Sequence, residues 1–72
     1  MAEPVIWCGE IGPNDDFGRP IGKEFIDGRT NRGPWGIMTR ESFLTHGMGK
    51  LGPGWGQRYE KQPDGRWLKV EG

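Results

Sequence analysis

Few side chains in this 72-residue chain could do chemistry, and they are scattered along it. His46 and Cys8 are the only residues of their kinds. A structural zinc site needs four ligands and a disulfide needs two cysteines, so neither is expected within this chain. Asp15 and Asp16 are adjacent but lack a third carboxylate nearby, and Ser42 stands in no nucleophile-elbow context. We therefore expect no enzymatic activity, no metal and no cofactor.

A glycine motif at residues 47–52 matches the pattern G-x-G-x-x-G literally. The dinucleotide fingerprint needs a strand before this pattern and a helix after it. Here we expect a helix before it, and Gly-Pro-Gly follows it. A flexible or tightly turned connector over residues 47–56 is the favoured interpretation. The alternative is a phosphate cradle of backbone N–H groups with Lys50 as its cation.

The one convincing helix signal lies near residues 40–46. Thr39 can cap the first turn with its hydroxyl. Met38 and Phe43 have the spacing of a hydrophobic staple, which would fix how the chain enters the helix. His46 and then Gly47 predict its end, with the glycine in the left-handed conformation.

This helix is too short to be stable alone, since isolated helices below about 12–15 residues are marginal in water. We therefore expect both Phe43 and Leu44 to pack on a sheet.

Strands are predicted on both sides of the helix. Residues 5–7 are a short β-prone run. Residues 23–27 and 34–38 are expected to pair as one hairpin, and residues 57–61 and 66–70 as another.

Turn chemistry places the bends between these strands. Asp27-Gly28 predicts a turn at the end of the first strand of the first hairpin. Pro63-Asp64-Gly65 predicts a type I turn followed by a glycine bulge, with Tyr59 and Trp67 meeting across the second hairpin.

Composition predicts one small α+β domain over residues 1–72, with about four short antiparallel strands, one short helix and long loops. Fourteen glycines and six prolines favour loops, which we place at residues 9–22 and 47–56. Phe17 and Ile21 either anchor the first loop on the core or face a partner. Four Trp, three Phe and one Tyr supply enough apolar surface to order a small sheet.

Ten acidic and ten basic residues give no net charge, which argues against a general polyanion or membrane binder. The start of the chain lacks the basic and apolar regions of a signal peptide, and no run is long enough to span a membrane. We expect a monomeric, soluble protein of a reducing cytoplasm, without membrane contact.

The motif FIDGRTNRGPWGIM at residues 25–38, with the glycine-rich run that ends in GQRY at residues 56–59, resembles a family of small proteins encoded by tailed bacteriophages. The resemblance covers roughly residues 20–61. The common form of the family carries two cysteine pairs that look like a zinc site. Here only Cys8 remains, with Thr39 and Ser42 where the second pair would start, so no zinc site is carried over.

On size, cysteine-poor makeup and motif set, the chain further resembles a small transcription regulator of a Xanthomonas-infecting phage. That resemblance implies a protein of the host bacterial cytoplasm that binds host RNA polymerase near the N-terminus of its β′ subunit. It implies inhibition of σ-dependent initiation and antitermination during elongation, together with host NusA and close to the nascent RNA.

A protein-binding role suits the aromatic and arginine side chains, since Trp, Tyr and Arg supply much of the binding energy at interfaces. The alternative is a small nucleic-acid-binding module that stacks bases on Trp55 and Tyr59 and holds phosphates with Lys50 and Arg58. The residues predicted to bind a partner are Trp7, Phe17, Arg19, Trp35, Trp55, Arg58 and Tyr59.

Overall fold

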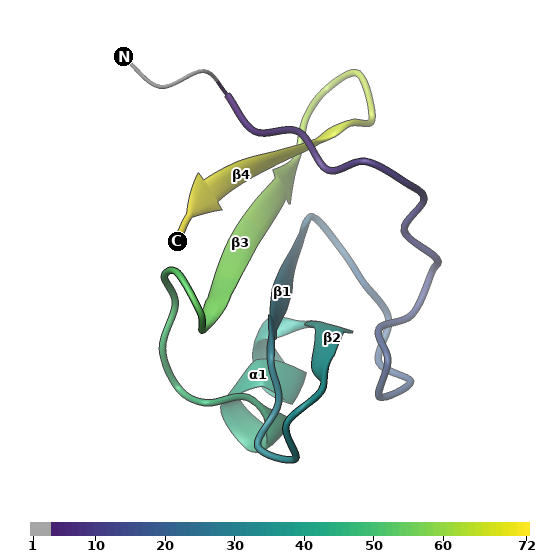
Figure 1. Ribbon diagram of the computed structural model, residues 1–72. Coiled ribbons are helices and arrows are strands. Elements are labelled where there is room, and N and C mark those ends of the chain that lie inside the picture. Colours follow the sequence, from purple (N-terminus) through teal and green to yellow (C-terminus); the bar gives the residue numbers. More distant parts are fainter. Residues whose placement is uncertain (1–3) are drawn as a thin grey trace.

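The computed structural model describes residues 4–72, which form one four-stranded antiparallel sheet and one short helix (Figure 1). The elements follow the order β1 (Glu24–Arg29), β2 (Trp35–Met38), α1 (Arg40–His46), β3 (Gly56–Lys61) and β4 (Trp67–Glu71). In space the strand order is β2-β1-β3-β4. The α+β class predicted from the sequence is confirmed.

The first hairpin pairs β1 with β2, and its turn lies later than the sequence suggested. The prediction of a turn at Asp27-Gly28 is wrong, because Gly28 lies inside β1 opposite Gly36. Gly28 also faces Gly56 of β3, so three glycines form a row across the sheet. A Cβ added to Gly56 would lie 3.0 Å from the Gly28 Cα, so the row keeps two strands close at this level.

The second hairpin has the predicted turn. The Gly65 N–H donates to the Gln62 carbonyl at 2.9 Å, and Gly65 has a φ of +88°. Tyr59 lies opposite Lys69, whereas Trp67 lies opposite Lys61. The two rings are therefore not direct cross-strand partners.

Helix α1 begins at the predicted cap, since the Thr39 hydroxyl accepts from the Ser42 N–H at 3.2 Å. Its predicted end is only partly right. Gly47 follows the helix but has a φ of −84°, so it does not adopt the left-handed conformation. Glycine is favoured there for space, because a Cβ would lie 2.5 Å from the Phe43 ring.

Two apolar clusters lie on opposite faces of the sheet, because side chains alternate along β1. Ile26 packs with Met38 and Phe43 under the helix, with Leu51 against them. On the other face, Phe25 stacks on Tyr59 with the ring centroids 5.0 Å apart. The rings of Trp7 and Trp67 meet that of Phe25 edge-on. Only one of the two predicted helix residues is packed, since Leu44 is 76% exposed.

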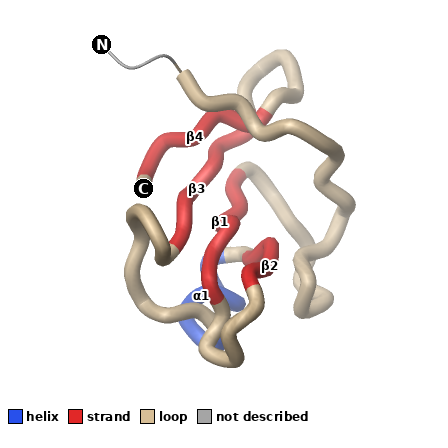
Figure 2. Tube along the Cα trace, in the orientation of Figure 1, coloured by secondary structure: helices blue, strands red, loops and turns tan. Residues whose placement is uncertain are grey.

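Long stretches without regular strands or helices connect these elements (Figure 2). The predicted first strand is reduced to one bridge between Ile6 and Leu68. The loop of residues 9–22 is tied by a bridge between Asn14 and Pro20, and the glycine-rich connector by one between Gly52 and Gly56. Within residues 4–72, no helix has the length and apolar character needed to cross a membrane.

Candidate functional site

Two of the seven predicted partner-binding residues belong to the aromatic cluster. Tyr59 is 6% exposed and stacks on Phe25. Trp7 meets both rings edge-on at 5.3 Å. These two side chains are thus placed where they hold the N-terminal segment on the sheet, and Tyr59 offers almost no surface to a partner.

Arg58 is the centre of an ion-pair network on the helix side of the sheet. Its guanidinium contacts carboxylates of Glu60 at 2.8 Å, and of Glu71 and Glu24 at 3.0 Å. The hydrogen bonds to Glu60 and then Glu71 raise the pKa of Arg58, against the opposing effect of burial. Arg40 binds Glu24 from the helix at 3.0 Å. The Arg58 side chain therefore links three strands. Its guanidinium is paired with carboxylates of this chain and offers little to a partner.

Asp15 ties the first loop to the start of the helix. Its carboxylate accepts from the Thr39 hydroxyl and N–H and from the Ser42 hydroxyl. It also accepts from the N–H groups of Phe17 and Arg19. Burial opposes the ionised form, yet the hydrogen bonds from Ser42, Thr39 and Arg19 outweigh it and hold the pKa of Asp15 well below its ordinary value. The loop is thereby fixed against α1.

Arg19 reaches the same helix. Its guanidinium donates to the Ser42 hydroxyl at 3.0 Å and lies 3.6 Å from the Glu41 carboxylate. Asp16 pairs with the outer edge of β2, where its N–H and carboxylate bind the carbonyl and N–H of Ile37. The loop thus covers part of an edge strand that would otherwise expose unpaired backbone groups.

The exposed apolar side chains are unevenly distributed. Six large ones are well exposed within residues 4–72, and three of these lie on α1 or close to its end, whereas Trp35 lies opposite Arg29 on the other face of the sheet. Sequence patterns do not identify Leu44 as a partner-binding residue, because a two-turn helix gives too little periodicity to say which face stays open. Met48 follows the helix in the glycine-rich connector, where no periodicity applies. We call these three residues the apolar surface: Phe17, Leu44 and Met48.

Phe17 links the loop to the end of the helix. Its ring stacks on the His46 imidazole, with centroids 4.1 Å apart and planes within 6°. A small hollow beside this stack is lined also by Asn31 and Arg32 of the β1–β2 turn. The apolar surface is therefore bordered by an exposed arginine.

Trp55 lies at the same end of the sheet, in the connector before β3. The Lys50 ammonium is 4.3 Å from its ring centroid, and the Arg29 guanidinium is 6.0 Å away. Of the four residues in the nucleic-acid alternative, Trp55 and Lys50 are thus brought together. Tyr59 is buried and Arg58 is held by carboxylates.

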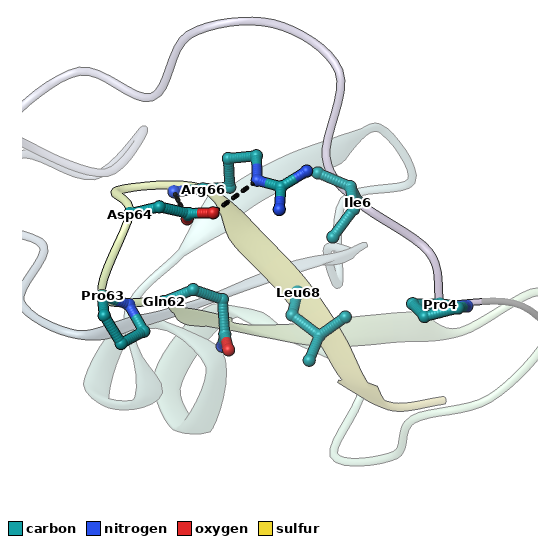
Figure 3. Close-up of a pocket in the computed structure, with 7 residues that line it drawn as sticks. All are labelled: Pro4, Ile6, Gln62, Pro63, Asp64, Arg66 and Leu68. Atoms are coloured by element: carbon teal, nitrogen blue, oxygen red, sulfur yellow. Dashed lines mark hydrogen bonds and ion pairs between the residues drawn. The ribbon is translucent and has the colours of Figure 1, made fainter.

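An open groove lies at the opposite end, beside the β3–β4 turn (Figure 3). Ile6 and Leu68 from neighbouring segments supply apolar lining, with Pro4 and Pro63 at its sides. Its charged groups, Asp64 and Arg66, are paired with each other at 2.8 Å. The groove lacks a set of converging, unpaired polar groups such as ligand sites use for orientation.

Metal-binding and nucleophilic groups do not converge in the part of the chain that the structure describes. No three His, Cys, Asp or Glu side chains among residues 4–72 are placed to hold a metal ion. Cys8 is an exposed free thiol.

Comparison of the chain with protein families, with curated proteins and with solved structures finds no match.

Proposed function

We propose that this chain is a phage-encoded transcription regulator that binds host bacterial RNA polymerase near the N-terminus of the β′ subunit. In this role it inhibits σ-dependent initiation and acts as an antiterminator during elongation, together with NusA. The proposal rests on the motif resemblance over residues 25–38 and 56–59.

The motif residues have a structural part in the fold. FIDGR contributes most of β1, WGIM is β2, and GQRY begins β3. Gly28, Gly36 and Gly56, the three glycines that meet across the sheet, all belong to the motif. The motif residues thus supply much of the scaffold.

The observation that most favours a protein partner is the apolar surface. Leu44 is 76% exposed on a helix that is otherwise docked through Phe43. Phe17 at 40% adds an aromatic ring, and Arg32 borders it. Exposed aromatic and aliphatic side chains with an arginine at the rim have the composition of a protein-binding surface.

The mechanism is steric and allosteric. A small domain docked by its apolar surface would occupy a region of the polymerase that σ contacts, which blocks initiation. On an elongating enzyme it would narrow the RNA exit path so that a terminator hairpin cannot fold. Neither effect requires a reacting group on this chain.

In vitro transcription with purified host polymerase tests the proposal. We expect the protein to reduce transcripts from a σ-dependent promoter and, when added after initiation with NusA, to increase readthrough of an intrinsic terminator. The double variant Leu44→Ser, Met48→Ser should lose both effects. The control is Val5→Ser, Val70→Ser, which changes two exposed apolar residues outside the apolar surface and should retain both. Unchanged initiation and termination with the wild-type protein would reject the proposal.

A further inference from the structure

We infer that the end of the sheet around Trp55 binds unpaired nucleotides of a single-stranded nucleic acid. Lys50 and Arg29 would hold phosphates there, while the indole ring of Trp55 receives a base. This inference does not depend on polymerase binding.

The first argument is which cationic side chains are already paired with carboxylates. Four of the six arginines lie in ion pairs with carboxylates within residues 4–72, namely Arg19, Arg40, Arg58 and Arg66. Arg29 and Arg32 form no ion pair with any described residue, and neither does Lys50. All three are exposed. The arginines that remain available for an anionic ligand therefore belong to the same end of the fold.

The second argument is how the fold brings these cations together. Arg29 ends β1, and its N–H donates to the Trp55 carbonyl at 2.8 Å. The following turn is joined to the end of the helix by a Thr30–Gly47 bridge and by the Asn31 N–H on the His46 carbonyl at 2.7 Å. Lys50 follows three residues after Gly47. Residues distant in sequence thus converge at the start of β3.

The third argument is the ring between the cations. Trp55 is half-buried, so its position is fixed while part of its surface stays open. In the free protein the Lys50 ammonium lies 4.3 Å over the ring. An ammonium attracted by a phosphate can leave the ring on its flexible side chain, and the uncovered indole then offers a stacking surface to the adjacent base.

The local distribution of charge explains how a chain with no net charge can bind a nucleic acid. Glu24, Glu60 and Glu71 surround Arg58, and Arg40 also binds Glu24, so two guanidinium groups largely offset these three carboxylates. The carboxylate nearest along β1, Asp27, forms no ion pair with Arg29 or with any other described residue. Arg29, Arg32 and Lys50 outnumber Asp27 at this end, so the local charge is positive even though the total charge is zero.

Fluorescence anisotropy of labelled 12-nucleotide oligouridylate, titrated with the full chain at several salt concentrations, tests the inference. Neutralisation of two phosphates, by Lys50 and Arg29, predicts a slope of log affinity against log salt near about −1.4 for a single strand. Lys50→Gln and Arg29→Gln should each flatten this slope by about 0.7. Trp55→Leu should weaken binding roughly 5- to 150-fold, as expected for the loss of one base stack.

The matched control is Lys61→Gln. Lys61 also lies over a tryptophan, with its ammonium 5.8 Å from the Trp67 ring, but at the opposite end of β3. We expect the Lys61→Gln variant to bind oligouridylate with the affinity and the salt slope of the wild type. Amide spectra of all variants establish that each is folded.

Three further ligands test which class of molecule this surface binds. Oligothymidylate should bind much as oligouridylate does, and a duplex of the same length should bind more weakly, because its bases are already stacked and paired. An acidic peptide of 12 residues should bind more weakly as well. The inference is overturned by absence of saturable binding at low salt, by an equal loss in Lys61→Gln, or by an acidic peptide that binds as tightly as the oligonucleotide. Loss of oligonucleotide binding with transcription effects intact would leave the proposed function standing.

Discussion

The carboxylate of Asp15 accepts hydrogen bonds from both the backbone N–H and the hydroxyl of Thr39, at 2.8 and 2.9 Å. Thr39 in turn caps the helix by accepting from the Ser42 N–H. A loop residue 24 positions earlier therefore orients the cap of a helix that is too short to be stable alone. This arrangement positions the apolar surface.

Replacing Asp15 with Asn should destabilise the protein strongly. The amide nitrogen would face donors that now bind a charged oxygen, and hydrogen bonds to charged groups contribute about 1.5–3 kcal/mol each. We expect a loss of roughly 2–4 kcal/mol in urea unfolding. Asp16→Asn is the control, since Asp16 is exposed and its carboxylate accepts a single bond, from Ile37. An Asp15→Asn protein as stable as the control would contradict the account.

Acid should weaken the fold through the same residue. The folded-state pKa of Asp15 is depressed, so its stabilisation is complete above the unfolded-state pKa near 4 and is lost as the pH falls below it. We expect the urea midpoint of the wild type to fall between about pH 5 and 2. The midpoint of Asp15→Asn should fall less steeply. A residual slope is expected from Glu24, whose pKa is lowered first by its hydrogen bond with Arg40. Parallel pH profiles for the two proteins would refute this assignment.

Gly47→Ala should destabilise the protein, because there is no space for the added Cβ. The backbone φ of −84° suits any residue, but the new Cβ would lie 2.5 Å from the Phe43 ring. Overpacking of this kind costs about 1–3 kcal/mol. Gly12→Ala is the control, because no atom lies within 4 Å of its added Cβ, and it should be neutral or slightly stabilising. Thermal unfolding of both variants measures the difference.

Leu44→Ser should leave stability almost unchanged, within about 0.5 kcal/mol, as is usual for surface substitutions. Its neighbour Phe43 is buried against Ile26 and Met38, and Phe43→Ala should cost about 3–5 kcal/mol. Urea unfolding compares the two. A large loss on Leu44→Ser would mean that this side chain is packed, and the apolar surface would lose its most exposed member.

Local chemistry allowed much of the fold to be predicted. The cap at Thr39 and the turn at Gly65 depend on neighbouring residues, and both were found where expected. Gly28 and Gly47 were misjudged for a shared reason. Glycine is favoured at position 28 by the close approach of Gly56 and at position 47 by the Phe43 ring, and sequence patterns do not reveal such contacts.

The candidate surfaces were harder to predict for the same reason. Seven aromatic and arginine residues had been selected by type, and type does not distinguish Tyr59 in the core from Trp35 at the surface. Three of the five hydrogen bonds of Asp15 reach Thr39 and Ser42, which lie 24 and 27 residues away, so no local pattern could predict them.

The most direct test of the central proposal is an NMR titration of the isotope-labelled chain with purified host RNA polymerase, and with a fragment of its β′ N-terminus, at moderate salt. We predict saturable signal loss with the polymerase, and localised shifts with the fragment at the apolar surface of Phe17, Leu44 and Met48. A well-dispersed spectrum that responds to neither ligand would contradict the proposed function.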